Sequence, residues 1–176
     1  SMPYGQDSLR VDTVLGTLKA LVHTLQTDIV PKFAGEEKTK LTTATGKLKK
    51  SVVAAEKTFK SRMKSTFTQM KDSDKKVFQD LESQLEKLKA LIPQKSEFYQ
   101  PVAKAHIAVY KATQEMSAES KKPILSTYLE AYDPNTSRSR QVTLLGAYMN
   151  FDLEYRITVG GIELGPDIVD AERVVF

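Results

Sequence analysis

Residues 38–92 decide the fold of this chain, and they read KTKLTTATGKLKKSVVAAEKTFKSRMKSTFTQMKDSDKKVFQDLESQLEKLKALI. Steps of three or four residues from Leu41 reach an apolar side chain at almost every position, and the series is Leu41, Ala44, Leu48, Val52, Ala55, Phe59, Met63, Thr66, Met70, Asp74, Val77, Leu81, Leu85, Leu88 and Ile92. Only Thr66 and Asp74 are not apolar. The mean step is about 3.6 residues, the period of a straight α-helix. We therefore predict one helix over 38–92, roughly 55 residues and about 80 Å long.

The polar run 71–76 leaves a second interpretation open. Asp and Ser favour caps and turns, so the stretch is also compatible with two ordinary helices, the second with Ser73 as its N-cap. The apolar register passes through the polar run without a change of phase, and this favours the single helix.

Helices are also predicted on both sides of this stretch. The first begins near Ser8 and ends near Val30, because Pro31 disfavours helix at the residue before it. Its wide apolar stripe consists of Val11, Val14, Leu15, Leu18, Leu21, Val22, Leu25 and Ile29. The link 32–37 is short, so this helix should fold back antiparallel on the long one. Beyond Pro93, a further helix over about 96–117 and a short helical run at 124–129 are expected.

The last part of the chain changes from helical to alternating periodicity. Phe151, Leu153, Tyr155, Ile157 and Val159 alternate with polar residues, as in a half-buried strand. Gly160 and Gly161 suit a tight hairpin turn into a return strand that begins at Ile162. Residues 142–148 are ambiguous between strand and helix, 173–176 could form a last strand, and 133–137 is a clear turn.

These patterns predict a mainly α fold: an elongated antiparallel helical bundle or coiled coil around one long helix, with a small C-terminal β-hairpin appendage. The expected boundaries are a flexible lead at 1–7, a helical bundle at 8–132, a linker at 133–140 and a β-rich appendage at 141–176.

Composition excludes several classes of function. The chain has no Cys and only two histidines, His23 and His106, so thiolate chemistry is excluded and a zinc site is improbable. Both histidines are expected to be packing or rim residues, and no nucleophile, base and orienting group come together in the sequence. We therefore expect no enzyme activity, no cofactor and no metal. No apolar run approaches a membrane span. The N-terminus lacks the layout of a signal peptide, which together with the absence of Cys favours a cytoplasmic location; a membrane-peripheral location is expected only if the lysines described next bind lipid.

Positive charge is concentrated in the first half of the 38–92 stretch. Between Lys38 and Lys64 there are nine basic residues and one acidic residue, Glu56. The candidate residues for binding an anionic surface are Lys47, Lys49, Lys50, Lys57, Lys60, Arg62 and Lys64. Three interpretations are open: a solvated face that keeps the protein soluble, a surface for anionic phospholipid, and a surface for the nucleic acid backbone. Phospholipid is slightly favoured over nucleic acid, because no base-reading motif accompanies the lysines.

One family resemblance involves this basic region. The runs His23–Leu25, Ile29–Phe33, Glu36–Lys38, Lys47–Lys50, Ala54–Lys57 and Phe59–Lys60 resemble the middle helices of BAR and F-BAR membrane-curving domains, over about residues 18–67. The resemblance implies an elongated antiparallel dimer of long helices that presents Lys and Arg to phospholipid.

The function that the sequence favours is a non-enzymatic coiled-coil scaffold that binds protein partners and self-associates, most simply as a dimer. A helix of this length would expose an apolar seam that its neighbours do not cover. The predicted seam consists of Leu48, Val52, Phe59, Met63, Met70, Leu81, Leu85 and Leu88. Peripheral binding to anionic phospholipid through the lysines is the main alternative, and non-specific nucleic acid binding is the second.

Overall fold

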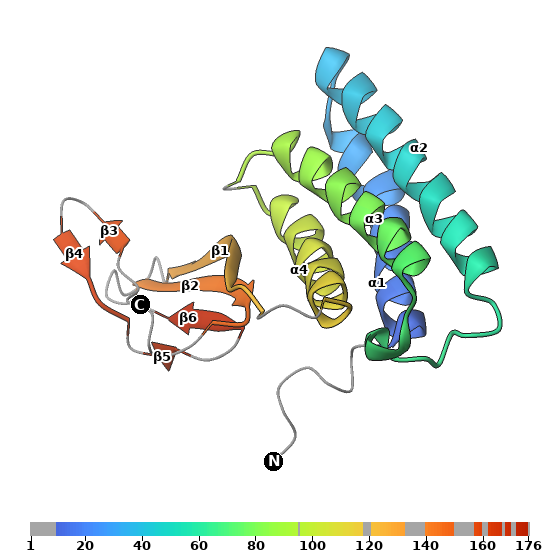
Figure 1. The fold of residues 1–176 in the computed structure, drawn as a ribbon. Helices are drawn as coiled ribbons and strands as arrows, with labels where there is room; N and C mark the ends of the chain where they lie inside the picture. Colours follow the sequence, from blue (N-terminus) through green and yellow to red (C-terminus); the bar gives the residue numbers. More distant parts are fainter. Residues whose placement is uncertain are drawn as a thin grey trace. The chain divides into compact units, whose positions relative to one another are not determined.

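The structure is a computed structural model that describes residues 10–94, 96–117, 121–132, 140–149, 157–159, 162–166, 168–169 and 172–175. The chain divides into two compact units, residues 1–120 and residues 121–176, which are described separately below. The first unit is helical and the second is built of β-strands (Figure 1). The mainly α fold with a small β-rich C-terminal part is therefore confirmed.

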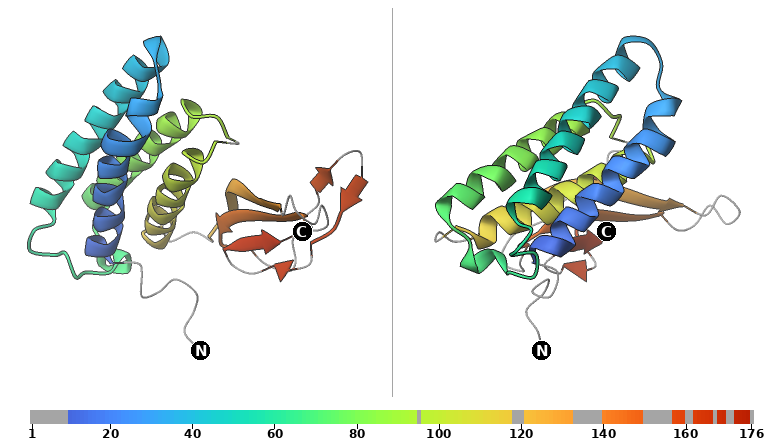
Figure 2. Two further views of the ribbon diagram at one scale, coloured as in Figure 1. Left: turned by 180° about the vertical axis from the view of Figure 1, so that it is seen from behind. Right: turned by 90° about the vertical axis from the view of Figure 1, so that its right-hand side faces the viewer.

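Four helices form the first unit in an up-down-up-down arrangement (Figure 2). They are α1 (Val11–Thr24), α2 (Gly35–Thr58), α3 (Asp72–Ala90) and α4 (Tyr99–Glu115). Each helix packs against its neighbour in sequence, and α1 also packs against α4, so the four helices enclose one core. This is the antiparallel bundle that short helix connections favour.

The end of the first helix follows the prediction made from Pro31. After α1, the chain continues as a π-helical turn (Leu25–Ile29) and a 3-10 turn (Val30–Lys32) before it reverses into α2. Proline lacks a backbone N–H and its ring collides with the carbonyl four residues earlier, so an α-helix cannot continue regularly into this position. The helix therefore widens and stops there.

The prediction of a single helix over 38–92 is wrong. Helix α2 ends at Thr58, and the link 59–71, which includes a 3-10 turn at Phe67–Gln69, reverses the chain into α3. Two helices do occupy the stretch, as the alternative interpretation held, but the residue before α3 is Lys71 and not Ser73. The seam folds back on itself, so the ring of Phe78 packs 5.4 Å from that of Phe59 and edge-on at 4.9 Å from that of Phe67.

The two polar exceptions in the apolar series lie where the chain turns. Thr66 forms an isolated antiparallel bridge with Arg10, just before the start of α1. Asp74 is buried in the first turn of α3, where its carboxylate accepts a hydrogen bond from the Lys71 N–H (3.1 Å) and pairs with Arg62 (2.7 Å). Both residues thus stabilise the link in which the chain reverses direction between α2 and α3, although the apolar period continues through it.

The link is also tied to the beginning of α1 through the backbone. The N–H of Val11 donates to the carbonyl of Ser65 (3.1 Å), and the N–H of Asp12 donates to the carbonyl of Met63 (2.7 Å). The first N–H groups of any α-helix have no partner within the helix, so these bonds satisfy donors that would otherwise need water or a capping side chain.

The predicted self-association seam is the interior of the helical unit. Leu48, Val52, Phe59, Leu81, Leu85 and Leu88 are all at most 2% exposed, while Met63 and Met70 are half-buried against the same core. The expectation of an apolar seam left open to solvent is therefore wrong for these side chains. The four short helices cover one another, which a single rod of 38–92 could not have achieved.

The second unit contains a sheet with the strand order β1–β2–β6–β5, antiparallel throughout, and a separate β3–β4 hairpin. The strands are β1 (Ile124–Tyr132), β2 (Arg140–Ala147), β3 (Ile157–Val159), β4 (Ile162–Leu164), β5 (Ile168–Val169) and β6 (Arg173–Val175).

The second unit contains two of the strand features predicted from the sequence. The predicted hairpin is confirmed by the pairing of Val159 in β3 with Ile162 in β4, and the last strand is confirmed as β6; the predicted turn residues 160–161 lie outside the described residues. The ambiguous segment 142–148 belongs largely to β2. The predicted strand residues 151–156 and the turn at 133–137 lie outside the described residues.

The short helical run expected at 124–129 is wrong, because this segment is the first part of β1. Its apolar residues can satisfy a helical spacing, but its pairing with β2 is decided by residues far along the chain. The helical unit therefore ends near residue 120 and not at the predicted 132. Of the predicted linker 133–140, Arg140 belongs to β2 and the rest lies outside the described residues.

Gly146 explains how β1 and β2 pair closely. The register of this pair shifts between Leu125 and Thr127, and a side chain on Gly146 would collide with the backbone of Ile124. The Gly146 N–H also donates to the carbonyl of Glu172 (2.9 Å), which lies just before β6. Glycine allows the three segments to meet at this point.

Candidate anion-binding face

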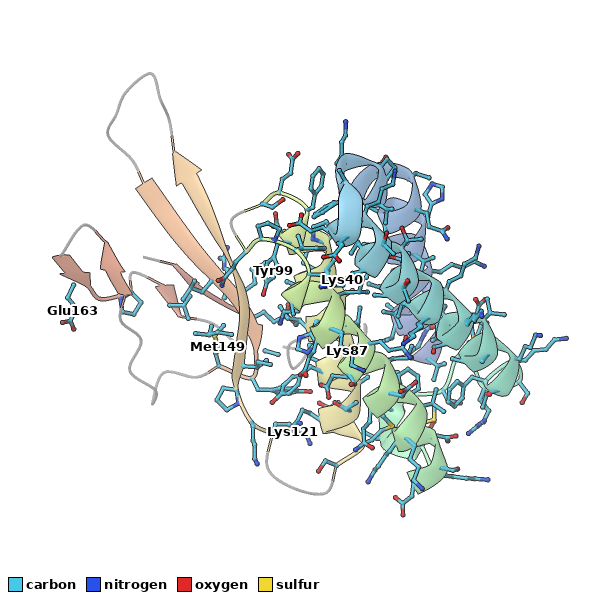
Figure 3. The ribbon with its side chains drawn as sticks, turned by 90° about the horizontal axis from the view of Figure 1, so that it is seen from above. Lys40, Lys87, Tyr99, Lys121, Met149 and Glu163 are labelled. Atoms are coloured by element: carbon cyan, nitrogen blue, oxygen red, sulfur yellow. The ribbon has the colours of Figure 1, made fainter. Side chains whose placement is uncertain are left out.

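Six of the seven predicted anion-binding residues are exposed on α2 and the following link. Lys47, Lys49, Lys50 and Lys57 lie on α2, and Lys60 and Lys64 lie in the link. The buried side of α2 is formed by Leu41, Thr45, Leu48, Val52 and Ala55, so helical geometry turns the lysines away from the core. Figure 3 shows nitrogen-tipped side chains extending from α2 on its side away from α4.

Arg62, the seventh predicted residue, has a different role. Its guanidinium donates to both carboxylate oxygens of Asp74, at 2.7 and 3.3 Å, and lies 4.9 Å from the centre of the Phe59 ring. The hydrogen bonds from Arg62 hold the pKa of the Asp74 carboxyl below its usual range, although burial of this carboxyl opposes the shift. Arg62 therefore holds the link to α3, and we do not count it in the anion-binding face.

Negative charge is nearly absent around these lysines. From Lys38 to Lys71 the sequence has one carboxylate, Glu56, and residues 13–27, which run from α1 into the π-helical turn, have none. Glu56 pairs with Lys19 of α1 at 3.6 Å. By contrast, α3 carries five acidic residues, Asp72, Asp74, Asp80, Glu82 and Glu86, and four lysines, Lys75, Lys76, Lys87 and Lys89. Positive charge is thus segregated on the α1–α2 side of the helical unit.

An exposed valine lies within this basic surface. Val53 is 44% exposed, and in the described part of the helical unit it is the only large hydrophobic side chain that is exposed. It follows Lys49 and Lys50 and precedes Lys57 on α2, so it lies among three exposed lysines. We use the name basic face for Lys47, Lys49, Lys50, Lys57, Lys60 and Lys64 together with Val53.

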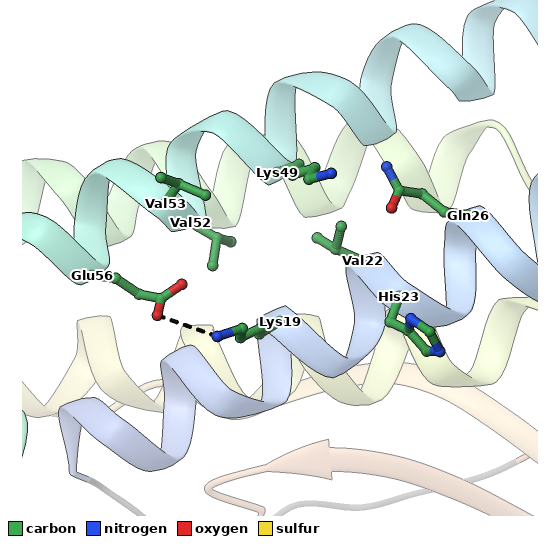
Figure 4. Close-up of a pocket in the computed structure, with 8 residues that line it drawn as sticks. All are labelled: Lys19, Val22, His23, Gln26, Lys49, Val52, Val53 and Glu56. Carbon is green, nitrogen blue, oxygen red and sulfur yellow. Dashed lines mark ion pairs between the residues drawn. The ribbon is translucent and has the colours of Figure 1, made fainter.

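A shallow pocket of about 180 Å³ lies at one side of the basic face, between α1 and α2 (Figure 4). Its lining consists of Lys19, Val22, His23 and Gln26 from α1 and Lys49, Val52, Val53 and Glu56 from α2. Val22 and Val52 are buried and form its apolar floor. No pattern in the sequence indicates this pocket, because its two halves are about thirty residues apart and meet only through the packing of α1 on α2.

A second polar cluster lies between α3 and α4, and it contains the buried His106. Lys89 Nζ lies 3.5 Å from His106 Nδ1, and Glu86 Oε1 lies 3.5 Å from His106 Nε2. Burial and the neighbouring positive charge of Lys89 lower the pKa of His106 to about 4, so its imidazole is neutral at neutral pH. A neutral ring that accepts a hydrogen bond from Lys89 at Nδ1 carries its proton on Nε2, facing Glu86.

The pKa values of Lys89 and of the nearby Glu82 are also shifted so that their neutral forms are favoured. Burial lowers the pKa of Lys89, and burial together with the negative charge of Glu86 raises the pKa of Glu82, whose carboxylate accepts a hydrogen bond from Thr113 Oγ1 at 3.4 Å. Perturbed groups of this kind occur both at functional sites and in structural networks. His106 is 1% exposed and so is a packing residue, as predicted, whereas His23 lies on the rim of the pocket between α1 and α2.

Among the residues that the structure describes, no group of three or more His, Cys, Asp or Glu side chains is arranged to hold a metal ion. Within the same residues, no helix has the length and apolar character needed to cross a bilayer.

Comparisons with protein-family models, with curated proteins and with solved structures find no match to this chain. The fold therefore defines its class: an antiparallel four-helix bundle joined to a small β-sheet unit. The resemblance to BAR and F-BAR domains stays a prediction, because none of these comparisons bears on it.

Proposed function

We propose that the helical unit is a non-enzymatic binding module that attaches peripherally to anionic membrane surfaces through the basic face. One observation carries this proposal: six exposed lysines follow one another along α2 and the link, and the one carboxylate among them is already paired with Lys19. The uncompensated charge attracts an anionic surface without a dedicated pocket.

The expected strength of this attraction suits reversible binding. A basic residue close to an anionic bilayer contributes about 1 kcal/mol, so six lysines give about 6 kcal/mol as an upper bound. That free energy corresponds to a dissociation constant between about 1 mM and about 1 μM. Val53 adds a small apolar contact at the centre of the lysines. The attachment should weaken strongly with salt, because exposed charges are screened within about 10 Å at 0.1 M ionic strength.

The distribution of charge favours this function over mere solubility. A face that only keeps a protein soluble is well served by interspersed charges of both signs, as found on α3. The basic face is not interspersed in this way. The concentration of lysine on one side of the bundle therefore supports a partner with negative charge.

Nucleic acid is the less suitable anionic partner. Proteins that bind single strands combine a basic groove with aromatic side chains that stack on bases. Phe59 and Phe67, the aromatic residues nearest to the lysines, are at most 1% exposed, and Arg62 is engaged by Asp74. The phosphate backbone could still contact the lysines, so duplex DNA belongs among the tests.

Self-association through the predicted seam is not part of this proposal. Six of its eight side chains are in the core of a single helical unit, so a second copy could reach them only if the bundle opened. Binding to an acidic protein surface would use the same lysines as membrane binding and is one outcome of the experiment below.

The experiment is sedimentation of the full chain with phosphatidylcholine vesicles and with vesicles that also contain phosphatidylserine. The test variant carries Lys50→Glu and Lys57→Glu on the exposed side of α2, and the matched control carries Lys76→Glu and Lys87→Glu on the exposed side of α3. We expect the wild-type chain to bind only the phosphatidylserine vesicles. The affinity of the test variant should fall at least about tenfold, because its net charge changes by four units, and the affinity of the control should change little.

Two results would contradict the proposal. One is equal binding to both kinds of vesicle, and the other is an equal loss in the two double variants. Salt-dependent binding to duplex DNA, or capture by an acidic protein without any binding to anionic vesicles, would assign the basic face to a different partner.

A further inference from the structure

The pocket between α1 and α2 has a polar composition that the basic face as a whole does not require. It brings together two lysines, one amide, one imidazole and one carboxylate over a floor of two valines. The ion pair between Lys19 and Glu56 lies at one end (3.6 Å). Figure 4 shows the side chains of Lys49 and Gln26 directed toward one another at the other end, across the opening between the helices.

The two ends of the pocket differ in net charge. Glu56 compensates Lys19, which leaves Lys49 as the uncompensated cation of the lining; its side chain is exposed and makes no ion pair with any residue that the structure describes. Gln26 adds an amide with two N–H donors. An ammonium group beside an amide donor is suited to a compact, highly charged oxyanion, and lysine commonly binds phosphate as a point charge.

The volume limits what can enter. About 180 Å³ admits a phosphate group with a few attached atoms but not a large ligand. The apolar floor of Val22 and Val52 offers no polar group to a ligand, but it can contact the carbon atoms next to a phosphate. A phosphate monoester carries a charge between about −1.5 and −2 at neutral pH, so it is attracted more strongly than a phosphate diester, which carries a single charge.

We propose that this pocket binds a phosphate monoester group, with Lys49 as its principal cation and Gln26 as a hydrogen-bond donor. The inference rests on the proposed membrane function for one source of the ligand, a phosphomonoester lipid headgroup. A soluble phosphomonoester has the same chemistry and is the other source. Glu56 opposes binding, because it is the carboxylate of the lining and because it engages Lys19.

The neighbouring lysines Lys49 and Lys50 provide a matched pair of variants. Both are exposed on α2, but only Lys49 lines the pocket. Lys49→Gln and Lys50→Gln change the charge of the basic face equally and differ in their effect on the pocket. Glu56→Gln is the third variant, since it removes the opposing carboxylate and frees Lys19.

The first measurement is a titration of the full chain with glycerol phosphate, followed by backbone amide NMR shifts. We expect saturable shifts around residues 22–26 and 49–53, a loss of about tenfold in affinity for Lys49→Gln, as for one charge-assisted hydrogen bond, and little change for Lys50→Gln. Affinity should rise in Glu56→Gln, which a purely structural role of this residue would not produce.

The second measurement compares vesicles containing phosphatidic acid, a monoester, with vesicles containing phosphatidylglycerol, a diester, at equal surface potential. We expect a preference for phosphatidic acid that Lys49→Gln abolishes and Lys50→Gln retains. Binding to both lipids without preference, together with no shifts from glycerol phosphate, would overturn this inference and leave the membrane proposal standing. Shifts from glycerol phosphate without binding to any anionic vesicle would overturn the membrane proposal and assign the pocket to a soluble ligand.

Discussion

Replacement of Asp74 by Ala tests the account of how the chain reverses between α2 and α3. The Asp74 side chain is 6% exposed and accepts two hydrogen bonds from Arg62 and one from the Lys71 N–H. Removing a carboxylate that caps the first turn of a helix costs about 1 kcal/mol. Loss of hydrogen bonds to a charged group costs about 1.5–3 kcal/mol, and the lower end applies because the Arg62 side chain, 34% exposed, regains water. We therefore expect a loss of about 2–3 kcal/mol in the free energy of unfolding.

Asp72 supplies the matched control. It lies in the same first turn of α3, but its side chain is 99% exposed and its contact with Lys75 is a surface pair at 3.5 Å. Asp72→Ala should lower the free energy of unfolding by less than about 0.5 kcal/mol. The measurement is urea unfolding followed by the helical circular dichroism signal of the full chain. Equal effects of the two substitutions would refute the role given to Asp74 in the reversal.

The pH dependence gives an independent check on the same pair. The folded-state pKa of Asp74 is lowered, so its contribution to stability is present above the unfolded value of about 3.9 and is lost as pH falls through the folded pKa. The difference in unfolding free energy between wild type and Asp74→Asn should therefore be constant near neutral pH and shrink below about pH 4. A difference that persists undiminished into the acid range would show that the charge of Asp74 contributes little.

Three further predictions concern other parts of the molecule. The pKa of His106 is about 4 in the folded state and 6.5 in the unfolded state, so the unfolded state takes up the proton first as pH falls. The free energy of unfolding should therefore decrease between about pH 6.5 and pH 4. Urea unfolding at several pH values should show a smaller decrease in His106→Gln. Gly146→Ala should disrupt the β1–β2 pairing, and amide hydrogen exchange should show a loss of protection in residues 121–176. Gly16→Ala lies at a helix position with open space around it and should stabilise α1 by about 0.5–1 kcal/mol. Leu85→Ala should lower the free energy of unfolding by about 2–5 kcal/mol, because this side chain is fully buried. Light scattering should show no change in mass. A change in oligomeric state would indicate that the seam contacts a second copy.

Local chemistry accounts for the parts of the fold that the sequence predicted well. Four such parts each depend on the properties of a few neighbouring residues: the helical period between residues 10 and 117, the stop near Pro31, the pairing of β3 with β4, and the strand at 173–175. The segregation of lysine around α2 is likewise a property of composition, and the exposure of Lys47, Lys49, Lys50 and Lys57 follows from the position of the apolar side of this helix.

The break between α2 and α3 was missed because periodicity cannot distinguish a continuous helix from two helices joined by a link of suitable length. Phe78 shows the change, since it is a fully buried core residue one position away from the expected Val77. The polar residues Thr66 and Asp74 marked the position of the break in the sequence. Their role depends on partners that the sequence does not reveal, Arg10 for Thr66 and Arg62 for Asp74.

Local sequence is sufficient to establish which segments favour helix or strand and where positive charge is concentrated, because these properties depend on residues within one or two turns of each other. Three features come instead from the packing of the complete helical unit: the apolar seam is buried within one chain, Arg62 pairs with Asp74, and α1 and α2 form a pocket beside Lys49. Apolar burial is non-directional, so the pattern of apolar residues does not specify what covers it. A seam is equally satisfied by a second copy or by its own other half, and only the packing of the whole unit selects between them.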